Sequence, residues 1–446
     1  METTLTAAPA ATTPTTRPGR WLEHWDPEDA GFWQSTGRSV ARRNLAFSVF
    51  AEFLGFCVWA LWSVVVPLLP AAGFDLSLNQ QFWLIAVPSL VGATIRIPYT
   101  FAVPAFGGRN WTVISSLLLL LPASVLAFIV TRPETPFGVL LACAALAGFG
   151  GGNFASSMTN ISFFFPEAEK GKALGLNAAG GNLGTGIVQM VVPAVIAIGA
   201  GVHLERAGLI FIPLALLSAV GAWRWMDNLS GIKADYKSFA LAAKNPHTWI
   251  ISFLYIGTFG SFIGYAGAFP TLLKTQFPTA PLGLAFIGAL IGALTRPLGG
   301  MVADRFGGAR VTIASFGVLT VGALAAIEGL QAKSFPLFFG AFLVLFTGAG
   351  IGNGATYRMI PAVFRAGVSP AALPAARKAA AGCIGIAGAV GAYGGFFIPR
   401  GFAMAKDHYG SLVPALSVFV AAYVLMALTV YAVYQRRGSA LASETI

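Results

Sequence analysis

Twelve apolar segments, each long enough to cross the hydrocarbon core of a bilayer, follow one another along this chain. An α-helix rises 1.5 Å per residue and the core is about 30 Å thick, so roughly 20 apolar residues span it. We therefore predict an all-α membrane protein with twelve transmembrane helices. The segments are 44–69, 81–105, 112–131, 136–163, 171–199, 207–225, 248–271, 281–303, 311–330, 335–364, 377–402 and 411–434.

The composition excludes a soluble globular protein. Charged residues make up 10% of the chain, against about 25% in soluble domains, and the mean hydropathy is +0.73. Cys57, Cys143 and Cys383 all lie inside apolar segments, which suits buried small hydrophobic residues better than a disulfide framework or a metal site. The four histidines lie outside the segments, and the polar segments carry no phosphate-binding loop and no Ser/His/Asp arrangement. We expect no enzyme, no catalytic residue, no cofactor and no metal.

The basic residues predict the orientation. An even number of spans places both termini on one side, and 19 of the 28 Lys and Arg residues fall on that side, against six on the other. The positive-inside rule then places both termini in the cytoplasm, and the net charge of +11 reflects topology, not nucleic-acid binding. The three remaining basic residues, Arg96, Arg296 and Arg358, lie within spans. We expect a multi-pass protein of the cell inner (cytoplasmic) membrane whose partners include the lipid bilayer.

An internal repeat divides the chain into two halves. Gly92-Ala93-x-x-Arg96 recurs 200 residues later as Gly292-Ala293-x-x-Arg296, and the same offset relates Phe106-Gly107-Gly108 to Phe306-Gly307-Gly308 and Gly152-Asn153 to Gly352-Asn353. Two pseudo-symmetric six-helix halves are the architecture of major facilitator transporters, with the substrate between the halves near the bilayer midplane. The expected parts are a cytoplasmic tail and surface segment (1–43), a six-helix half (44–225), a cytoplasmic linker (226–247), a second six-helix half (248–434) and a cytoplasmic tail (435–446). We expect residues 1–16 to be a disordered tail and residues 17–43 to lie at the membrane surface.

Arg96 and Arg296 point to an anionic substrate. Each lies about fifteen residues into its span, near mid-depth, where an arginine costs at least about 2.5–3.5 kcal/mol on insertion scales and normally faces a cavity and a partner. Among the acidic residues, only Glu52 lies near mid-depth, which is too few to pair both arginines for packing alone. The planar guanidinium fork suits a planar oxyanion, although phosphate or a carboxylate would also satisfy it.

Five stretches carry a family resemblance. The segment Gly148–Pro166 and the segment Ala173–Gly184 that follows it resemble the nitrate signature of the NarK-like nitrate/nitrite porter family of the major facilitator superfamily. The glycine-rich run Gly382–Pro399 resembles the second copy of this signature. The stretch Tyr255–Gly264 and the segment Trp25–Asp29 also match, and the resemblance extends from about Trp21 to Arg437.

The resemblance implies secondary active transport of nitrate and nitrite by alternating access. It implies that Arg96 and Arg296 bind the anion, that Phe154 and Phe259 form aromatic walls, and that Tyr255 and Asn182 donate further hydrogen bonds. From the residues alone, Phe154 and Phe259 would be assigned to the core. Gly180, Gly181 and Gly184 suit both close helix packing and the helix sliding that gating requires. The loop Gly299–Arg310, with Asp304, resembles the superfamily's loop motif and is interpreted as a gating and folding element.

The coupling mode stays open. Glu52 and Arg358 are not expected at these places in the nitrate/nitrite exchangers of the family. One hypothesis is nitrate/proton symport through a cavity carboxylate at Glu52, and the other is nitrate/nitrite antiport with Glu52 in a structural pair with Arg358. We favour the first. The alternatives outside this class are a channel, which the repeat disfavours, a sensor, for which no soluble output domain is present, and a transporter of another small oxyanion. We expect a monomer.

Overall fold

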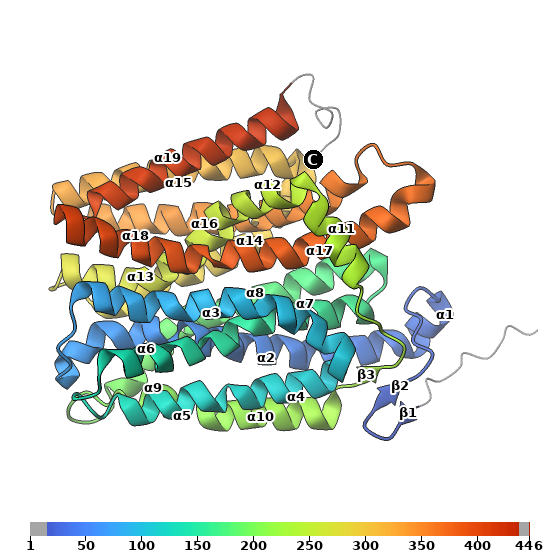
Figure 1. The fold of residues 1–446 in the computed structure, drawn as a ribbon, viewed down its shortest axis with the longest axis horizontal. Coiled ribbons are helices and arrows are strands. Elements are labelled where there is room, and N and C mark those ends of the chain that lie inside the picture. The colour runs from blue at the N-terminus through green and yellow to red at the C-terminus, as the bar shows by residue number, and fades with distance from the viewer. Residues whose placement is uncertain (1–15, 437–445) are drawn as a thin grey trace, which may run out of the picture.

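The computed structural model describes residues 16–436 and 446, and this part of the chain is almost wholly helical (Figure 1). The predicted disordered tail, apart from Thr16, and most of the predicted C-terminal tail lie outside the described residues. By length and composition, twelve helical segments of the described part can cross a membrane, which confirms the predicted number. They are Ala30–Ala72, Leu78–Phe106, Gly108–Ile129, Phe137–Phe164, Glu167–Ile196, Arg206–Trp225, Pro246–Gln276, Leu282–Phe306, Gly308–Gln331, Phe335–Arg365, Pro370–Tyr409 and Val413–Gln435.

Several spans are built from more than one helix. The first half of the chain contains β1 (Thr16–Arg17), β2 (Trp21–Leu22), α1 (Ala30–Phe32), η1 (Trp33–Gly37), α2 (Arg38–Val65), η2 (Val66–Ala72), α3 (Leu78–Phe106), α4 (Gly108–Leu118), α5 (Leu120–Ile129), α6 (Phe137–Leu146), α7 (Gly148–Phe164), α8 (Glu167–Ile196), α9 (Arg206–Leu209), α10 (Phe211–Trp225) and β3 (Asn228–Leu229). The second contains α11 (Tyr236–Lys244), α12 (Pro246–Tyr255), η3 (Ile256–Gly260), α13 (Ser261–Gln276), η4 (Leu282–Leu284), α14 (Ala285–Phe306), α15 (Gly308–Gln331), α16 (Phe335–Arg365), η5 (Pro370–Ala372), α17 (Leu373–Ala392), α18 (Gly394–Tyr409), α19 (Val413–Val430) and η6 (Tyr431–Gln435).

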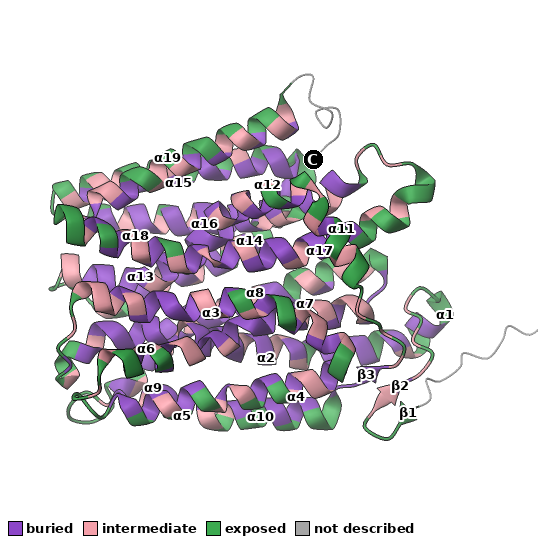
Figure 2. Cartoon of the chain, in the orientation of Figure 1, coloured by how far each residue is buried: buried purple, intermediate pink, exposed green. Residues whose placement is uncertain are grey.

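The long helices lie side by side and run between two ends of the molecule (Figure 1). The small sheet β1–β3, α1 and α11 lie at one end, which we name the linker end, and we name the opposite end the far end. Buried residues line the faces between helices, whereas exposed residues cover the outer faces (Figure 2). Many exposed residues are large and apolar, such as Leu217 on α10 and Val418 on α19, as a protein surrounded by lipid requires.

The two halves of the repeat form neighbouring groups of helices. The blue and green helices of the first half lie mainly below the yellow and red helices of the second (Figure 1). The groups meet where α8 packs on α14, where α3 packs on α17 and α18, and where α2 packs on α13. The repeat extends to backbone geometry, because Gly107 after α3 has φ +87° and Gly307 after α14 has φ +90°. Only glycine adopts such values at little cost.

The N-terminal segment packs against the protein at the linker end. Strand β1 pairs antiparallel with β2, and β2 pairs parallel with β3 of the linker. The Trp33 side chain is buried, and its Nε1 donates to Glu169 of α8 at 3.0 Å. Helix then runs without interruption from Ala30 into the first span, fourteen residues before the predicted start at 44. Local contacts with the protein therefore order a segment for which the sequence predicts only a place at the membrane surface.

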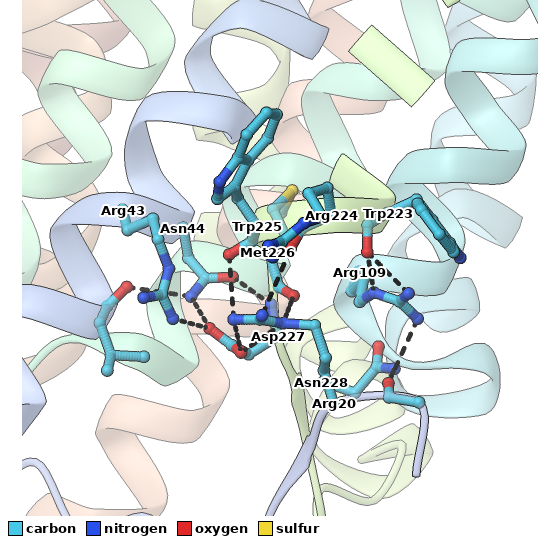
Figure 3. A network of polar contacts seen from close by, with 12 residues as sticks. Arg20, Arg43, Asn44, Arg109, Trp223, Arg224, Trp225, Met226, Asp227 and Asn228 are labelled. Carbon is cyan, nitrogen blue, oxygen red and sulfur yellow. Dashed lines mark hydrogen bonds and ion pairs between the residues drawn. The ribbon is translucent and has the colours of Figure 1, made fainter. Parts of the chain in front are cut away.

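A buried carboxylate joins this segment to the linker and to the first span (Figure 3). Asp227 is 2% exposed, and its Oδ1 accepts from Arg20 Nη2 at 2.7 Å. Its Oδ2 accepts from Arg43 Nη2 at 2.6 Å and from Asn44 Nδ2 at 2.9 Å. Nearby, Arg109 at the start of the third span donates two hydrogen bonds to the Trp223 carbonyl, at 2.9 and 2.7 Å. We name Arg20, Arg43, Asn44 and Asp227 the Asp227 cluster.

The second part of the linker is a helix. Asp235 caps α11, because its carboxylate accepts from the hydroxyl of Ser238 at 2.7 Å and from its backbone N–H at 2.9 Å, and these bonds hold the pKa of Asp235 below its usual value. Helix α11 packs on α17, while its Tyr236 ring stacks on Phe101 of α3 at 4.6 Å. The linker therefore contacts both halves.

Candidate functional site

Arg96 is buried at the interface between the halves. It lies on α3 and is 1% exposed. Its Nε donates to the Gly151 carbonyl of its own half at 3.0 Å, and its Nη1 donates to the Gly388 carbonyl of α17 in the other half at 2.7 Å. A single guanidinium thus connects both halves, and each of its bonds goes to a neutral carbonyl. Within residues 16–436 and 446, no carboxylate forms an ion pair with this guanidinium.

Arg296, the repeat partner of Arg96, faces the same region from α14. It is 6% exposed, and its Nη2 makes a long contact of 3.4 Å with the Tyr255 hydroxyl. Its Cζ lies 5.6 Å from the centre of the Phe154 ring, and the Cζ of Arg96 lies 4.6 Å from that same ring. The structure therefore brings two like charges to one aromatic side chain deep inside the protein.

Aromatic rings surround the Arg96 guanidinium. Besides Phe154, its Cζ lies 5.1 Å from the Phe259 ring and 5.3 Å from the Trp59 ring. Phe154 and Phe259 stack at 6.2 Å with 25° between their planes. Phe259 lies in η3, a π-helical turn directly after Tyr255, and such turns often mark functional sites. Phe154 thus lies beside both arginines, and Phe259 lies beside Arg96.

The Tyr255 hydroxyl is engaged with a neighbouring helix. It donates to Asn353 Oδ1 of α16 at 2.7 Å, so its hydrogen points away from Arg296. The structure therefore gives Tyr255 contacts that position Arg296 and Asn353. Asn182 on α8 is fully buried, and no hydrogen bond recorded in the described part of the chain joins its side chain to either arginine.

Glu52 lies in a polar cluster of the first half. Its carboxylate accepts from the Ser157 hydroxyl and from Asn177 Nδ2, the latter at 2.5 Å, and it is fully buried. It is close enough to Arg296 and Arg96 to interact electrostatically with both. Its Oε1 has no hydrogen-bond partner within residues 16–436 and 446.

The three predicted gating glycines all face α2. A Cβ atom at Gly181 would lie 2.3 Å from Glu52 Oε1, and one at Gly180 would lie 2.4 Å from Val49. At Gly184 the nearest atom would be the Phe53 carbonyl oxygen, at 2.5 Å. Real side chains do not make such contacts, so α8 approaches α2 this closely only because these positions are glycine.

The suggested pair of Glu52 with Arg358 is not formed. Arg358 Nε binds Asp304 of α14, and both side chains are 50% exposed. Arg358 and Asp304 thus form an ion pair within the second half, near its linker end, and do not belong to the cluster around Arg96. Helix geometry explains why Arg358 does not reach Glu52. Successive residues of an α-helix point about 100° apart, so Arg358 points away from the arginines that its neighbour Tyr357 faces.

Among the buried hydrogen-bond donors that lack a partner in the residues that the structure describes, four belong to the two arginines and to the α16 residues near Tyr255. We name them the free donors, and they are Arg96 Nη2, Arg296 Nη1, Asn353 Nδ2 and the Tyr357 hydroxyl. An unsatisfied buried donor costs about 1–3 kcal/mol, and more when it is charged. An anion whose oxygens only accept hydrogen bonds is the kind of ligand that such donors bind. The arrangement is thus suited to bind an oxyanion.

Sequence reasoning missed several residues of this region. Trp59 beside Arg96, Ser157 and Asn177 beside Glu52, and Asn353 and Tyr357 beside Arg296 were not predicted as site residues. The internal repeat could have indicated two of them, since the offset of 200 residues relates Asn153 to Asn353 and Ser157 to Tyr357. In each half these residues lie four apart, so they share one face of a helix.

Comparison with known proteins shows where this architecture recurs. The family model of the Major Facilitator Superfamily matches residues 51–399. A solved structure of a D-xylose-proton symporter matches with a TM-score of 0.66 at 16% identity, over 88% of this chain and 97% of that one. A bacterial homologue of the human lysosomal transporter Spinster matches with a TM-score of 0.65 at 16% identity, over 89% of this chain and 97% of that one. At such identities, the likeness concerns the fold.

Curated relatives are more similar in sequence. The nitrate/nitrite transporter NarU of Salmonella typhimurium is 42% identical over 93% of this chain and 96% of its own length, and that of Escherichia coli is 40% identical over the same shares. The probable nitrate/nitrite antiporter NarK2 of Thermus thermophilus is 34% identical, over 94% of this chain and 98% of its own length.

Proposed function

The chain belongs to the Major Facilitator Superfamily and, within it, to the family of nitrate/nitrite transporters, and we propose that it carries nitrate and nitrite across the bacterial inner membrane. The observation that carries this proposal is the pair of buried arginines, Arg96 and Arg296, at one aromatic ring between the halves. A planar anion satisfies their free N–H groups in plane, with the rings of Phe154 and Phe259 beside its faces. The linker end, which carries most of the basic residues outside the spans, is the cytoplasmic end in this proposal.

Transport proceeds by alternating access of the two halves. In the empty site Arg96 and Arg296 repel each other, whereas a bound anion attracts both and lowers the cost of closing the halves around it. Gly180, Gly181 and Gly184 let α8 slide along α2 during this movement. Asp304 and Arg358 stabilise the second half at its linker end as it moves.

The coupling mode follows from the membrane potential. An inside-negative potential opposes entry of an anion by about 2.3 kcal/mol per charge per 100 mV, so uptake requires either exchange for nitrite or symport with two or more protons. Glu52 favours symport, because a buried carboxylate near two arginines can carry a proton when the anion is bound. Nitrate/nitrite exchange, with Glu52 structural, is the second candidate, supported by the similarity to the probable nitrate/nitrite antiporter NarK2 of Thermus thermophilus.

Uptake into liposomes distinguishes the two modes. We expect an acid-outside pH gradient to drive nitrate into empty liposomes, and Glu52→Gln to abolish this stimulation while nitrate-for-nitrate exchange continues. Glu328→Gln on the exposed face of α15 is the matched control and should retain the pH response. Uptake that requires internal nitrite and is indifferent to Glu52→Gln would instead establish exchange.

Polar contacts join the two halves at the far end in this structure. Arg400 of α18 lies over the Trp83 ring of α3 at 4.1 Å and donates to Asn79 Oδ1 at 2.6 Å. Asn79 Nδ2 in turn donates to Asp407 Oδ2 at 2.5 Å. A cavity between the halves, lined by Ser89, Ile263 and other residues, lies between this contact and Arg96. Alternating access requires the contact to break when the far end opens.

Arg400→Ala should shift the protein toward the state that is open at the far end. A partly buried contact worth about 0.5–1 kcal/mol changes a two-state population by about two- to fivefold. The measurement is labelling of Ile263→Cys from outside by a membrane-impermeant maleimide, with and without Arg400→Ala. The native cysteines are all buried. Equal labelling rates in the two backgrounds would show that this contact does not hold the far end closed.

A further inference from the structure

One face of α16 points toward the arginines and carries two polar residues, Asn353 and Tyr357. They lie four residues apart and therefore on the same side of the helix. Asn353 Oδ1 accepts from the Tyr255 hydroxyl at 2.7 Å. The Tyr357 ring lies 5.7 Å from the Tyr255 ring and 5.7 Å from the Cζ of Arg296. Both side chains thus belong to the surroundings of Arg296.

Each of the two residues offers a buried donor to this region. Asn353 Nδ2 and the Tyr357 hydroxyl are two of the four free donors, which lack partners inside the described ranges 16–436 and 446. The side-chain oxygen of Asn353 accepts a hydrogen bond from Tyr255, so its amide nitrogen is the atom available to a ligand. The phenol is electrically neutral and adds a hydrogen bond without adding to the repulsion between the arginines.

In the first half, the residue equivalent to Tyr357 lies next to a carboxylate and donates a hydrogen bond to it. The repeat offset relates Ser157 to Tyr357, and alignment of Pro67 with Pro270 relates Glu52 to Tyr255. In the first half the Ser157 hydroxyl donates to Glu52. In the second half, the residue equivalent to Glu52 is Tyr255, which has no carboxylate. The hydroxyl at position 357 is therefore left for an anion that is not part of the protein.

We propose that the Tyr357 hydroxyl, together with Asn353 Nδ2, donates hydrogen bonds to the transported anion and sets the preference for nitrate over nitrite. This inference rests on the proposed function. Nitrate carries three acceptor oxygens and nitrite carries two. The free N–H groups of Arg96 and Arg296 serve two oxygens, and the donors of α16 serve the third, which only nitrate has. In this proposal Tyr357 is a specificity-determining residue. The neighbouring Arg358 has no such role, because its side chain binds Asp304.

Tyr357→Phe tests this role because it removes one hydroxyl and keeps the ring. We expect the KM for nitrate to rise about tenfold, the effect of one lost hydrogen bond to a charged ligand, while the KM for nitrite rises less than about threefold. Tyr99→Phe is the matched control. Tyr99 has a buried hydroxyl that is likewise without a partner in the described residues, but its ring packs on Trp111 at 4.9 Å. This control should leave both KM values unchanged.

The outcomes separate this inference from the function on which it rests. If wild-type vesicles take up neither anion, the proposed function fails and the role of Tyr357 fails with it. If the wild type transports both and Tyr357→Phe leaves the ratio of the two KM values unchanged, only the role of Tyr357 is overturned. Should the variant reconstitute poorly, the thermal stabilisation of detergent-purified protein by nitrate and by nitrite replaces KM. A selective loss of the nitrate effect supports the inference, and an equal loss of both overturns it.

Discussion

Replacing either Arg96 or Arg296 with lysine is expected to lower nitrate uptake by about 100-fold or more. Lysine keeps the positive charge but presents a compact ammonium in place of the planar fork, so the in-plane pair of hydrogen bonds to the anion is lost. Two charge-assisted hydrogen bonds are worth about 3 kcal/mol or more, and each 1.4 kcal/mol is tenfold. Lysine at position 96 also cannot reach both the Gly151 and the Gly388 carbonyls as Arg96 does.

Initial rates of nitrate uptake into proteoliposomes measure this effect. Arg305→Lys is the control, because Arg305 is exposed near the linker end of α14 and should tolerate the exchange. Matched thermal stability of all three variants would separate a binding defect from misfolding. Normal uptake by both Arg96→Lys and Arg296→Lys would refute the assignment of the site.

Asp227→Ala is expected to destabilise the protein strongly. The substitution removes the acceptor that holds Arg20, Arg43 and Asn44 together. Breaking a fully buried ion pair costs about 3–5 kcal/mol. The two arginine side chains are 33% and 38% exposed and can turn to water, so we expect about 2–4 kcal/mol.

The apparent melting temperature of purified protein reports this change, and it should fall by several degrees. Asp304→Ala is the matched comparison, because it removes an aspartate that also pairs with an arginine but is 50% exposed. Exposed pairs contribute about 0–1 kcal/mol, so its effect should be much smaller. Equal melting temperatures for Asp227→Ala and the wild type would show that the Asp227 cluster does not anchor the N-terminal segment.

The spans and the arginine pair could be predicted from the sequence because both depend on strong local signals. A run of roughly 20 apolar residues has few uses other than crossing a bilayer, and an arginine inside such a run needs an unusual environment. The repeat then related Arg96 to Arg296. The observed turns at Gly107 and Gly307 share their positive φ, as the repeated Phe-Gly-Gly segments imply.

The sequence could not predict which of two adjacent side chains faces the site. The side chains of Tyr357 and Arg358 point about 100° apart around α16. Because the span is apolar on all sides, its sequence does not indicate which face points into the protein. The antiport hypothesis therefore offered Arg358 as a structural partner for Glu52, whereas Arg358 binds Asp304. Likewise, the pairing of β2 with β3 joins residues about 200 positions apart, and no local pattern indicates it.

Counterflow of isotopically labelled nitrate tests the central claim most directly. Liposomes containing the protein are loaded with unlabelled nitrate and exposed to labelled nitrate without any gradient of pH or potential, so the result does not depend on the coupling mode. Our account predicts label accumulation that saturates with nitrate, is inhibited by nitrite, and is absent from Arg96→Lys vesicles. Label entry no faster than into protein-free liposomes would contradict nitrate transport through the site between Arg96 and Arg296.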